Sequence, residues 1–258
     1  QVMRSIPSSS SYDTEDETVS VLVLAGGYDG REDIDSVEIY ESIHSSDKGE
    51  ECYSLDSKWM LAKGEMSTVR SAAGVAAVDG RIYYAGGSTG SVAQGAVESF
   101  HLKRSRGGFR CDWRCEPSLS VPRMAVSLLA TSAYEEKEKN CSILWAVGGY
   151  NNRRSVDTVE MMEIDPFGIS SSRWRPGPPL LEARCSFGAI VTEGGAIIVV
   201  GGHGGRSGSV LDSCELLDPR IGTWQRLPRM RRKRSCLAAA SLPGDRLIAC
   251  GGHDGERA

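Results

Sequence analysis

Residues 24–40, LAGGYDGREDIDSVEIY, contain the pattern that decides the fold: an apolar run closes at a glycine doublet, and a Glu follows among apolar residues. The pattern returns in residues 84–100, YAGGSTGSVAQGAVESF, in residues 146–162, AVGGYNNRRSVDTVEMM, and in residues 199–219, VVGGHGGRSGSVLDSCELLDP. The doublets are Gly26–Gly27, Gly86–Gly87, Gly148–Gly149, Gly201–Gly202 and Gly251–Gly252. A pattern that recurs every roughly 50 to 60 residues is typical of propeller blades or a comparable array.

Each copy also carries a Glu, a Trp and an Arg at nearly constant spacing. The Glu follows the second glycine by 11 or 13 residues, and the Arg follows the Trp by 10 or 11. These residues are Glu38, Glu98, Glu160 and Glu215; Trp59, Trp113, Trp174 and Trp224; and Arg70, Arg123, Arg184 and Arg234. The repeats cover approximately residues 18–69, 70–122, 123–183 and 184–233, and a partial copy covers residues 234–258.

The local pattern within a copy predicts four short strands. After Arg70, residues 72–78 are apolar, Asp79–Gly80 is a hairpin signal, and residues 81–85 form the next apolar run. A third strand is expected around the Glu and a fourth around the Trp, and a helical period is sustained nowhere. Four antiparallel strands repeated radially make an all-β propeller, with about four and a half blades in this sequence.

The N-terminal segment, residues 1–17, is rich in serine and acidic residues. Arg4–Ser5 is similar to Arg70–Ser71, which suggests a degenerate first strand in this segment. The last copy stops shortly after its doublet. Because an open propeller exposes an unpaired strand edge, the sequence is expected to be a fragment of a larger propeller.

The repeated residues are most simply explained by structural roles. Glycine at the end of a strand allows positive φ and a close approach of chains, and Trp supplies packing surface between blades. Glu and Arg in register are expected to bind each other or backbone where blades meet. A catalytic residue is normally needed only once, so no catalytic residue is predicted among them.

These segments resemble the kelch repeat family, whose pattern is a strand ending in Gly–Gly, a polar loop, a Val-Glu-x-Tyr/Phe-like strand, and then a Trp and an Arg. The likeness extends over nearly the whole chain, from about Val19 to Gly255. It implies a kelch-type β-propeller of about six blades in the full protein. The fold alone names no role, because kelch propellers occur in both adaptors and enzymes.

The resemblance implies two classes of function. One is a non-catalytic scaffold that binds a partner protein or peptide, as in proteins whose BTB and BACK domains deliver substrates to a cullin ubiquitin ligase, or in actin and cytoskeletal scaffolds. The other is part of an enzyme of the galactose oxidase type. The four histidines are scattered, His203 and His253 stand where Tyr28 and Tyr150 stand in other copies, and nucleophile or phosphate motifs are missing. We therefore favour the interaction module, without a metal or cofactor.

Arginines recur in the loops that follow the doublets. Arg31, Arg153 and Arg206 lie four residues past a doublet, and Arg154 is adjacent to one of them. Equivalent loops converge at one face of a propeller, so these guanidinium groups are candidates for bidentate capture of carboxylate or phosphate, as in an acidic peptide. The alternative is that they are solvated loop charges, partly neutralised by neighbouring Asp and Glu.

Composition narrows the classes of partner and of cellular location that remain. The chain has 258 residues, 40% of them hydrophobic, and a net charge of −4. The basic run of residues 229–234 suggests a nucleic-acid patch, but the overall acidity argues against one. The sequence has no apolar run that spans a bilayer and no signal peptide pattern, so an intracellular protein with no membrane contact is expected. The eight cysteines, which include no C-x-x-C pair, are expected to be free thiols.

Overall fold

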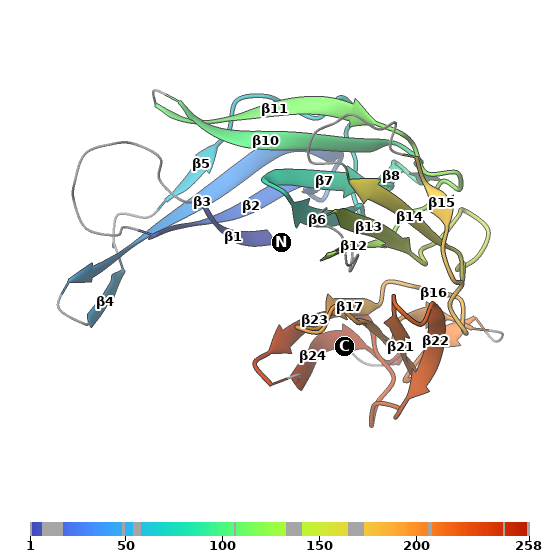
Figure 1. Cartoon of the computed structure of the whole chain (residues 1–258). Coiled ribbons are helices and arrows are strands. Elements are labelled where there is room, and N and C mark those ends of the chain that lie inside the picture. Colours follow the sequence, from blue (N-terminus) through green and yellow to red (C-terminus); the bar gives the residue numbers. More distant parts are fainter. Residues whose placement is uncertain are drawn as a thin grey trace.

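The computed structural model describes residues 2–6, 18–47, 50–53, 58–105, 107–132, 141–164, 173–205, 208–244 and 246–256. Every regular element within these ranges is a β-strand, and the strands form antiparallel sheets that fan out around a common centre (Figure 1). The prediction of an all-β propeller built from antiparallel sheets is confirmed.

Blade 1 is the first sheet. Its strand β1 (Val2–Ile6) pairs with β2 (Thr18–Tyr28), β2 pairs with β3 (Asp33–Asp47), and β3 pairs with β5 (Trp59–Leu61). The far end of β3 continues past the blade and pairs with β4 (Glu50–Tyr53) in a hairpin that projects from the body (Figure 1).

Arg4 does not take the position of the repeat arginines. It lies within β1 opposite Val21, whereas Arg70 precedes Gly74, the first residue of its strand. The similarity between Arg4–Ser5 and Arg70–Ser71 therefore does not give the register of this strand, because two residues are too few to fix it.

The next three sheets repeat the same four-stranded meander. Blade 2 contains β6 (Gly74–Val78), β7 (Arg81–Ala85), β10 (Val97–Ser105) and β11 (Gly108–Glu116); blade 3 contains β12 (Ser127–Ser132), β13 (Ser142–Val147), β14 (Val159–Ile164) and β15 (Arg175–Pro176); and blade 4 contains β17 (Gly188–Val191), β18 (Ile197–Val200), β21 (Cys214–Asp218) and β22 (Thr223–Leu227). Unit 5 is the two-stranded hairpin of β23 (Ser235–Leu242) and β24 (Arg246–His253).

Short strands build the loops that follow the doublets. β8 (Ser88–Thr89) pairs with β9 (Val92–Ala93), and β19 (His203–Gly204) pairs with both β16 (Arg184–Cys185) and β20 (Ser209–Val210). These pairings fix the loops at one end of the blades.

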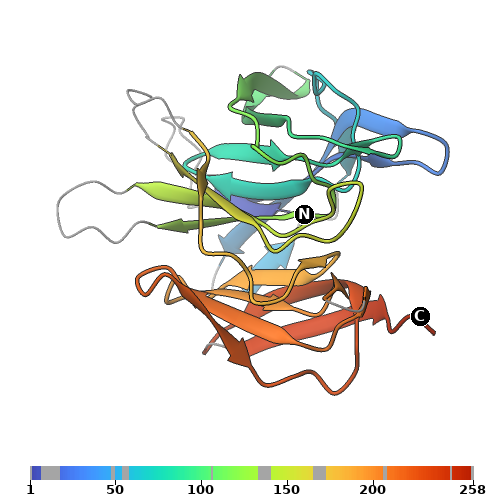
Figure 2. The same ribbon diagram turned by 90° about the vertical axis from the view of Figure 1, so that its right-hand side faces the viewer.

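The core lies between neighbouring sheets. Apolar side chains form one cluster at each interface, from blades 1 and 2 through blade 4 and unit 5. The innermost strands β1, β6, β12, β17 and β23 contact one another in that order. Figure 2 shows the orange and red strands of blade 4 and unit 5 below the earlier blades, so the units follow one another around the centre.

A chain of backbone hydrogen bonds joins the units near the centre. Ala125 N–H donates to the Ala72 carbonyl (2.8 Å), Ser186 N–H to that of Ala125 (3.3 Å), and Cys236 N–H to that of Ser186 (2.8 Å). These four residues have φ values of 51°, 49°, 52° and 56°, in the left-handed region. Each stands two residues after a repeat Arg, and each is small, so a small residue at this place is the sequence signal of the left-handed position.

The doublets are the points where the next unit attaches. Gly149 N–H donates to the carbonyl of Arg184 (2.9 Å), and the second glycine of the other three complete units does the same to the next repeat Arg. Gly148 shows why the position needs glycine, since its φ is 58° and a Cβ there would lie 2.6 Å from the Arg184 carbonyl oxygen. A side chain would force the two units apart.

Candidate functional site

The repeat Arg and Glu form buried ion pairs inside three blades. Arg123 Nη2 lies 2.6 Å from Glu160 Oε1, and Arg123 Nη1 donates to the carbonyls of Gly148 and Thr158. Glu160 Oε2 accepts the N–H of Ser120 at 2.8 Å. Burial lowers the pKa of Arg123, and the charge of Glu160 opposes that shift. The pair therefore satisfies both charges and joins a blade to the connection that enters it.

The same arrangement recurs in the neighbouring blades. Arg70 pairs with Glu98 in blade 2, and Arg184 Nη2 lies 2.6 Å from Glu215 Oε1 in blade 4. All six side chains of the three pairs are buried. Because their hydrogen bonds are directed at each other and at backbone, these acids are not accessible to a substrate.

The equivalent residues at the two ends differ. Glu38 in blade 1 is exposed, and no ion pair to it occurs within the described ranges. Arg234 is half-buried and donates from Nη1 to the Gly251 carbonyl at 2.6 Å.

The repeat tryptophans also differ in burial, which increases from blade 1 to blade 4. Trp224 is 6% exposed and Trp59 is 45% exposed, while Trp113 and Trp174 are half-buried. In blades 2 to 4 the indole N–H donates to a carbonyl of the connection that enters the blade, from Trp113 to Gly64, from Trp174 to Pro117 and from Trp224 to Pro178. The Trp thus fixes the path of the chain between blades.

The loops after the doublets are exposed turns held by Asx hydrogen bonds. Asp29 Oδ1 accepts the N–H of Arg31 (2.7 Å) and of Glu32 (2.9 Å), and Asn151 Oδ1 accepts those of Arg153 (3.2 Å) and Arg154 (3.1 Å). The backbone donors of Glu32 and Arg31 lower the pKa of Asp29. Both turns leave the arginine side chains in solvent.

These loops are linked to one another in blade order. Gly90 N–H donates to Asp33 Oδ2 (2.6 Å), and Ala93 N–H donates to Asn152 Oδ1 (2.9 Å). Ser155 Oγ donates to the His203 carbonyl (2.8 Å). The four loops therefore form one connected surface, which we call the loop face.

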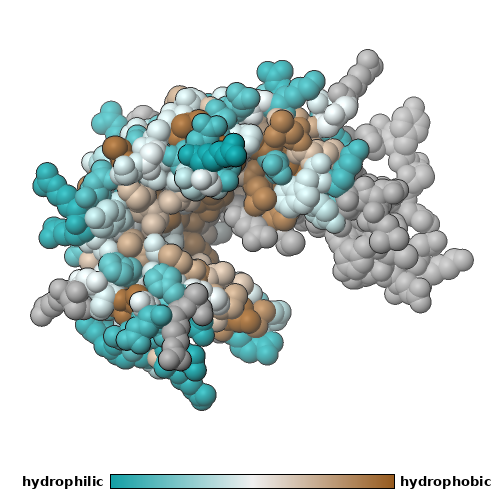
Figure 3. Space-filling model, turned by 180° about the vertical axis from the view of Figure 1, so that it is seen from behind, coloured by the Kyte–Doolittle hydropathy of each residue, from teal (hydrophilic) through white to brown (hydrophobic). Residues whose placement is uncertain are grey.

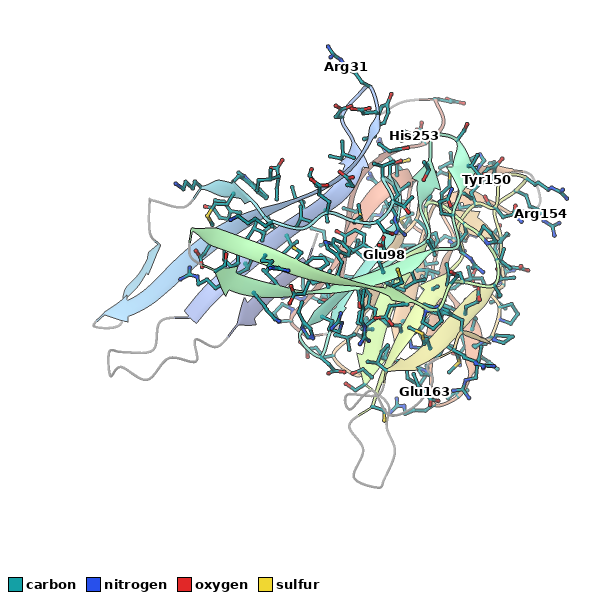
Figure 4. All side chains as sticks on the ribbon, turned by 90° about the horizontal axis from the view of Figure 1, so that it is seen from above. Arg31, Glu98, Tyr150, Arg154, Glu163 and His253 are labelled. Carbon is teal, nitrogen blue, oxygen red and sulfur yellow. The ribbon has the colours of Figure 1, made fainter. Side chains whose placement is uncertain are left out.

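Arg31 and Arg154, two of the candidate arginines of the loop face, do not converge. Figure 4 shows Arg31 and Arg154 on different loops, with side chains that point away from the body and from each other. Arg153 is next to Arg154 and exposed, and Arg206 lies outside the described residues. The arginines therefore offer separate anchor points.

Tyrosine and histidine side chains complete the loop face. Of the residues that follow a doublet, Tyr28, His203 and His253 are exposed, Tyr150 is half-buried, and Ser88 is buried. Figure 4 shows Tyr150 and His253 between Arg31 and Arg154 in the view from above. The sequence pattern alone showed these residues as interchangeable repeat positions. Their place directly after the doublets is the signal that they lie together on the loop face.

The remaining features of the described ranges are those that bear on metal binding, on thiols and on a membrane. No group of three or more His, Cys, Asp or Glu side chains is placed to hold a metal ion in them. Seven cysteines in them are recorded as free thiols: Cys111, Cys115, Cys141, Cys185, Cys214, Cys236 and Cys250. No helix among them has the length and apolar character needed to cross a membrane.

Comparison with known proteins finds kelch sequences. The family described as Kelch motif matches residues 184–231. Kelch repeat-containing protein kel-10 of Caenorhabditis elegans is 24% identical over 229 residues, which are 88% of this chain and 35% of the worm protein. Kelch-like protein 23 of Mus musculus is 33% identical over 74 residues, 28% of this chain and 13% of that protein.

The human Kelch-like protein 23 is 29% identical over 122 residues, 44% of this chain and 20% of that protein. The match thus spans about a third of the length of the worm relative, at 35%, and a smaller part of the mammalian ones.

Proposed function

Since this chain belongs to the kelch repeat family, we propose that it is a non-catalytic interaction module that binds a partner protein or peptide at the loop face. The observation that carries the proposal is the linkage of four exposed loops into one surface by three hydrogen bonds, which Asp33 and Asn152 accept and Ser155 donates. A surface fixed in this way is pre-organised, which reduces the entropy lost on binding.

The proposed ligand is an extended segment with acidic residues at two places. Arg31 lies at one side of the loop face and Arg153–Arg154 at another, so a segment that crosses the face meets a guanidinium group at each end. Guanidinium binds carboxylate in a bidentate manner, and the tyrosine and histidine side chains between the arginines supply contact area. Arg206 is proposed as a third anchor from its loop position.

The test is fluorescence anisotropy with short peptides that carry two acidic clusters at varied spacing. We expect binding to the wild-type chain and loss of most affinity in the Arg31→Ala/Arg153→Ala/Arg154→Ala variant. The matched control is Arg173→Ala/Arg175→Ala/Arg226→Ala, which removes the same charge from exposed positions on the outer strands of blades 3 and 4 and their approach. Equal binding by the wild type and the loop-face variant contradicts the proposal.

A more specific proposal concerns the cellular role of the module. The resemblance to kelch-like adaptors supports a role in substrate recognition for a cullin-type ubiquitin ligase, in an intracellular compartment, through domains outside this sequence. The test is co-purification of a cullin scaffold with the complete natural polypeptide. Recovery of actin filaments in place of a cullin supports the cytoskeletal alternative.

A further inference from the structure

The connections between the units share one backbone arrangement. In each of them the residue four positions before the repeat Arg is apolar, and its backbone N–H donates to a carbonyl of the preceding blade. These bonds run from Met66 to Asp35 (3.2 Å), from Leu119 to Gly95 (2.8 Å), from Leu180 to Asp157 (2.8 Å) and from Met230 to Asp212 (2.9 Å). The fold therefore accounts for the apolar residue and the repeat Arg of a connection, and it leaves the positions between and before them free to vary.

The connection from blade 4 to unit 5 fills these free positions with cations. Its residues 229–233, which we call the basic segment, read RMRRK and carry four positive charges. The equivalent residues 65–69, 118–122 and 179–183 read EMSTV, SLSVP and PLLEA and carry none. Because three connections of the same shape are built without a basic residue here, the charges of the basic segment are not required by the repeat.

The backbone of the basic segment is fixed by blade 4. Besides the bond of Met230, the N–H of Arg234 donates to the Leu211 carbonyl at 2.9 Å. The Met230 side chain packs against the apolar cluster of Val200 and Cys214. The segment is thus held at both ends and in the middle, which limits the entropy that its side chains and backbone lose on binding.

The basic side chains of the segment point into solvent. Arg229 is 62% exposed and pairs with Asp212, and Arg231, Arg232 and Lys233 are exposed as well. Among the residues that the structure describes, no ion pair to these last three is found. Three cations therefore stand close together on a fixed backbone without an acid of their own.

The exposure of the segment is a property of the connection itself. In blade 4 the loop after the doublet reaches the equivalent place, where Gly205 N–H donates to the Ala183 carbonyl at 2.8 Å, and Leu181 is still 48% exposed. The residue of unit 5 that corresponds to Gly205 is Gly255, which the structure includes. Arg231 takes the place of Leu181 and is exposed in the presence of that loop.

The basic segment lies beside the loop face. Its Arg229 pairs with Asp212, which closely follows the loop of β19 and β20, and Ser155 joins that loop to the loop of blade 3. In Figure 3 the surface of blade 4 and unit 5, the lower part of the molecule, is hydrophilic along its outer border. A ligand at this place therefore meets a charged surface.

A compact dianion is the ligand that fits these charges best. At most about 14 Å of chain separates residues 229 and 233, so the cations act at one place. A phosphate monoester carries a charge of about −1.5 to −2 at pH 7 and three acceptor oxygens, and a guanidinium group donates to two of them at once. A nucleic acid gains affinity with each phosphate that is neutralised, and the segment is too short to follow a series of phosphates.

We propose that Arg231, Arg232 and Lys233 bind the phosphate of a phosphorylated serine or threonine in a partner segment. The site goes beyond the proposed function, because it recognises a modification of the partner and uses none of the loop-face arginines. Phosphorylation of the partner then controls its capture, since the same segment without phosphate offers the basic segment no dianion.

The probe is a set of three peptide pools with random residues around a central phosphoserine, serine or glutamate. We expect the immobilised protein to retain the phosphoserine pool on the order of tenfold better than the serine pool, because the phosphate accepts several charge-assisted hydrogen bonds. The glutamate pool should be retained little better than the serine pool. Mass spectrometry measures the retained peptides, and equal retention of the phosphoserine and glutamate pools overturns the proposal.

The protein side is tested with the Arg231→Gln/Arg232→Gln/Lys233→Gln variant. We expect it to lose the preference for phosphoserine, while the matched control Arg173→Gln/Arg175→Gln/Arg226→Gln, which removes the same charge from other exposed positions, keeps it. All six side chains are exposed, so the folded state is expected to persist, and circular dichroism checks it. A preference that survives in the first variant overturns the proposal.

A third variant separates this site from the loop face. Arg31→Ala/Arg153→Ala/Arg154→Ala should keep the preference for phosphoserine over serine, whatever its affinity for acidic peptides. If this variant loses the preference and the basic-segment variant keeps it, the phosphate binds at the loop-face arginines, which overturns this inference and leaves the proposed function standing. Tighter binding of oligothymidylate than of the phosphoserine pool through the basic segment would indicate a nucleic-acid site and would also overturn it.

Discussion

The interior blades and the two end units carry the same repeat residues in different environments. Arg123 and Glu160 are buried and paired within blade 3, whereas Glu38 of blade 1 is exposed and the half-buried Arg234 guanidinium of unit 5 donates to the Gly251 carbonyl. The residue types at these positions are alike, so the difference comes from whether the partner side chain of the same blade is in place within the described residues.

The largest expected contrast lies between two equivalent arginines. Arg123→Ala leaves Glu160 buried without a partner and should reduce the free energy of unfolding by about 3–5 kcal/mol. Arg234→Ala removes one hydrogen bond from a half-buried group and should cost less than about 1.5 kcal/mol. Chemical denaturation of both variants measures the difference. Similar losses would mean that the interior pair is not specially stabilised by its surroundings.

A second contrast concerns the repeat tryptophans. Trp224→Ala empties a buried site and breaks the bond to the Pro178 carbonyl, which should cost about 3–5 kcal/mol. Trp59 is 45% exposed, so Trp59→Ala should cost about 1 kcal/mol. Thermal unfolding of the two variants, with the wild type as reference, measures this. A larger shift for Trp59→Ala would show that the blade 1 surface is covered in solution.

The sequence predicts the part of the structure that depends on residue type and spacing. The doublets, the Glu and the Trp recur because glycine backbone, ion pairs and aromatic packing each need a specific side chain, and the all-β propeller follows from them. The structure then places Arg123 on Glu160 and Arg184 on Glu215.

Other features depend on neighbouring residues or on backbone torsions, and the sequence indicates them only weakly. The exposure of Glu38 and Trp59 depends on whether other residues pack over them, and the residue type alone does not indicate this. The different directions of Arg31 and Arg154 arise from the shapes of two loops. The left-handed conformation of Ala125 is hidden because an alanine by itself does not indicate a positive φ, and only its alignment with Ala72, Ser186 and Cys236 reveals the position.

That central position allows a third test of how the interior units are joined. Ala125 has a φ of 49°, so Ala125→Val places a β-branched residue in the left-handed region and should cost about 1–3 kcal/mol. Ala125→Gly relieves the same strain and should stabilise by up to about 1 kcal/mol. The control is Ala77→Val in β6, an extended strand position where valine is well tolerated. Equal effects of valine at both sites would contradict a role for the torsion.

The smallest expected effect is at Glu38, and its value lies in comparison with Glu160. Glu38→Gln removes an exposed charge and should change stability by no more than about 0.5 kcal/mol. Glu160→Gln removes the negative charge that faces buried Arg123 and should cost about 2–3 kcal/mol, as for a hydrogen bond to a charged group. The same substitution at two equivalent positions thus isolates what the buried Arg partner contributes. If Glu38→Gln costs as much as Glu160→Gln at high protein concentration and nothing at low concentration, a second copy supplies the missing cation at blade 1.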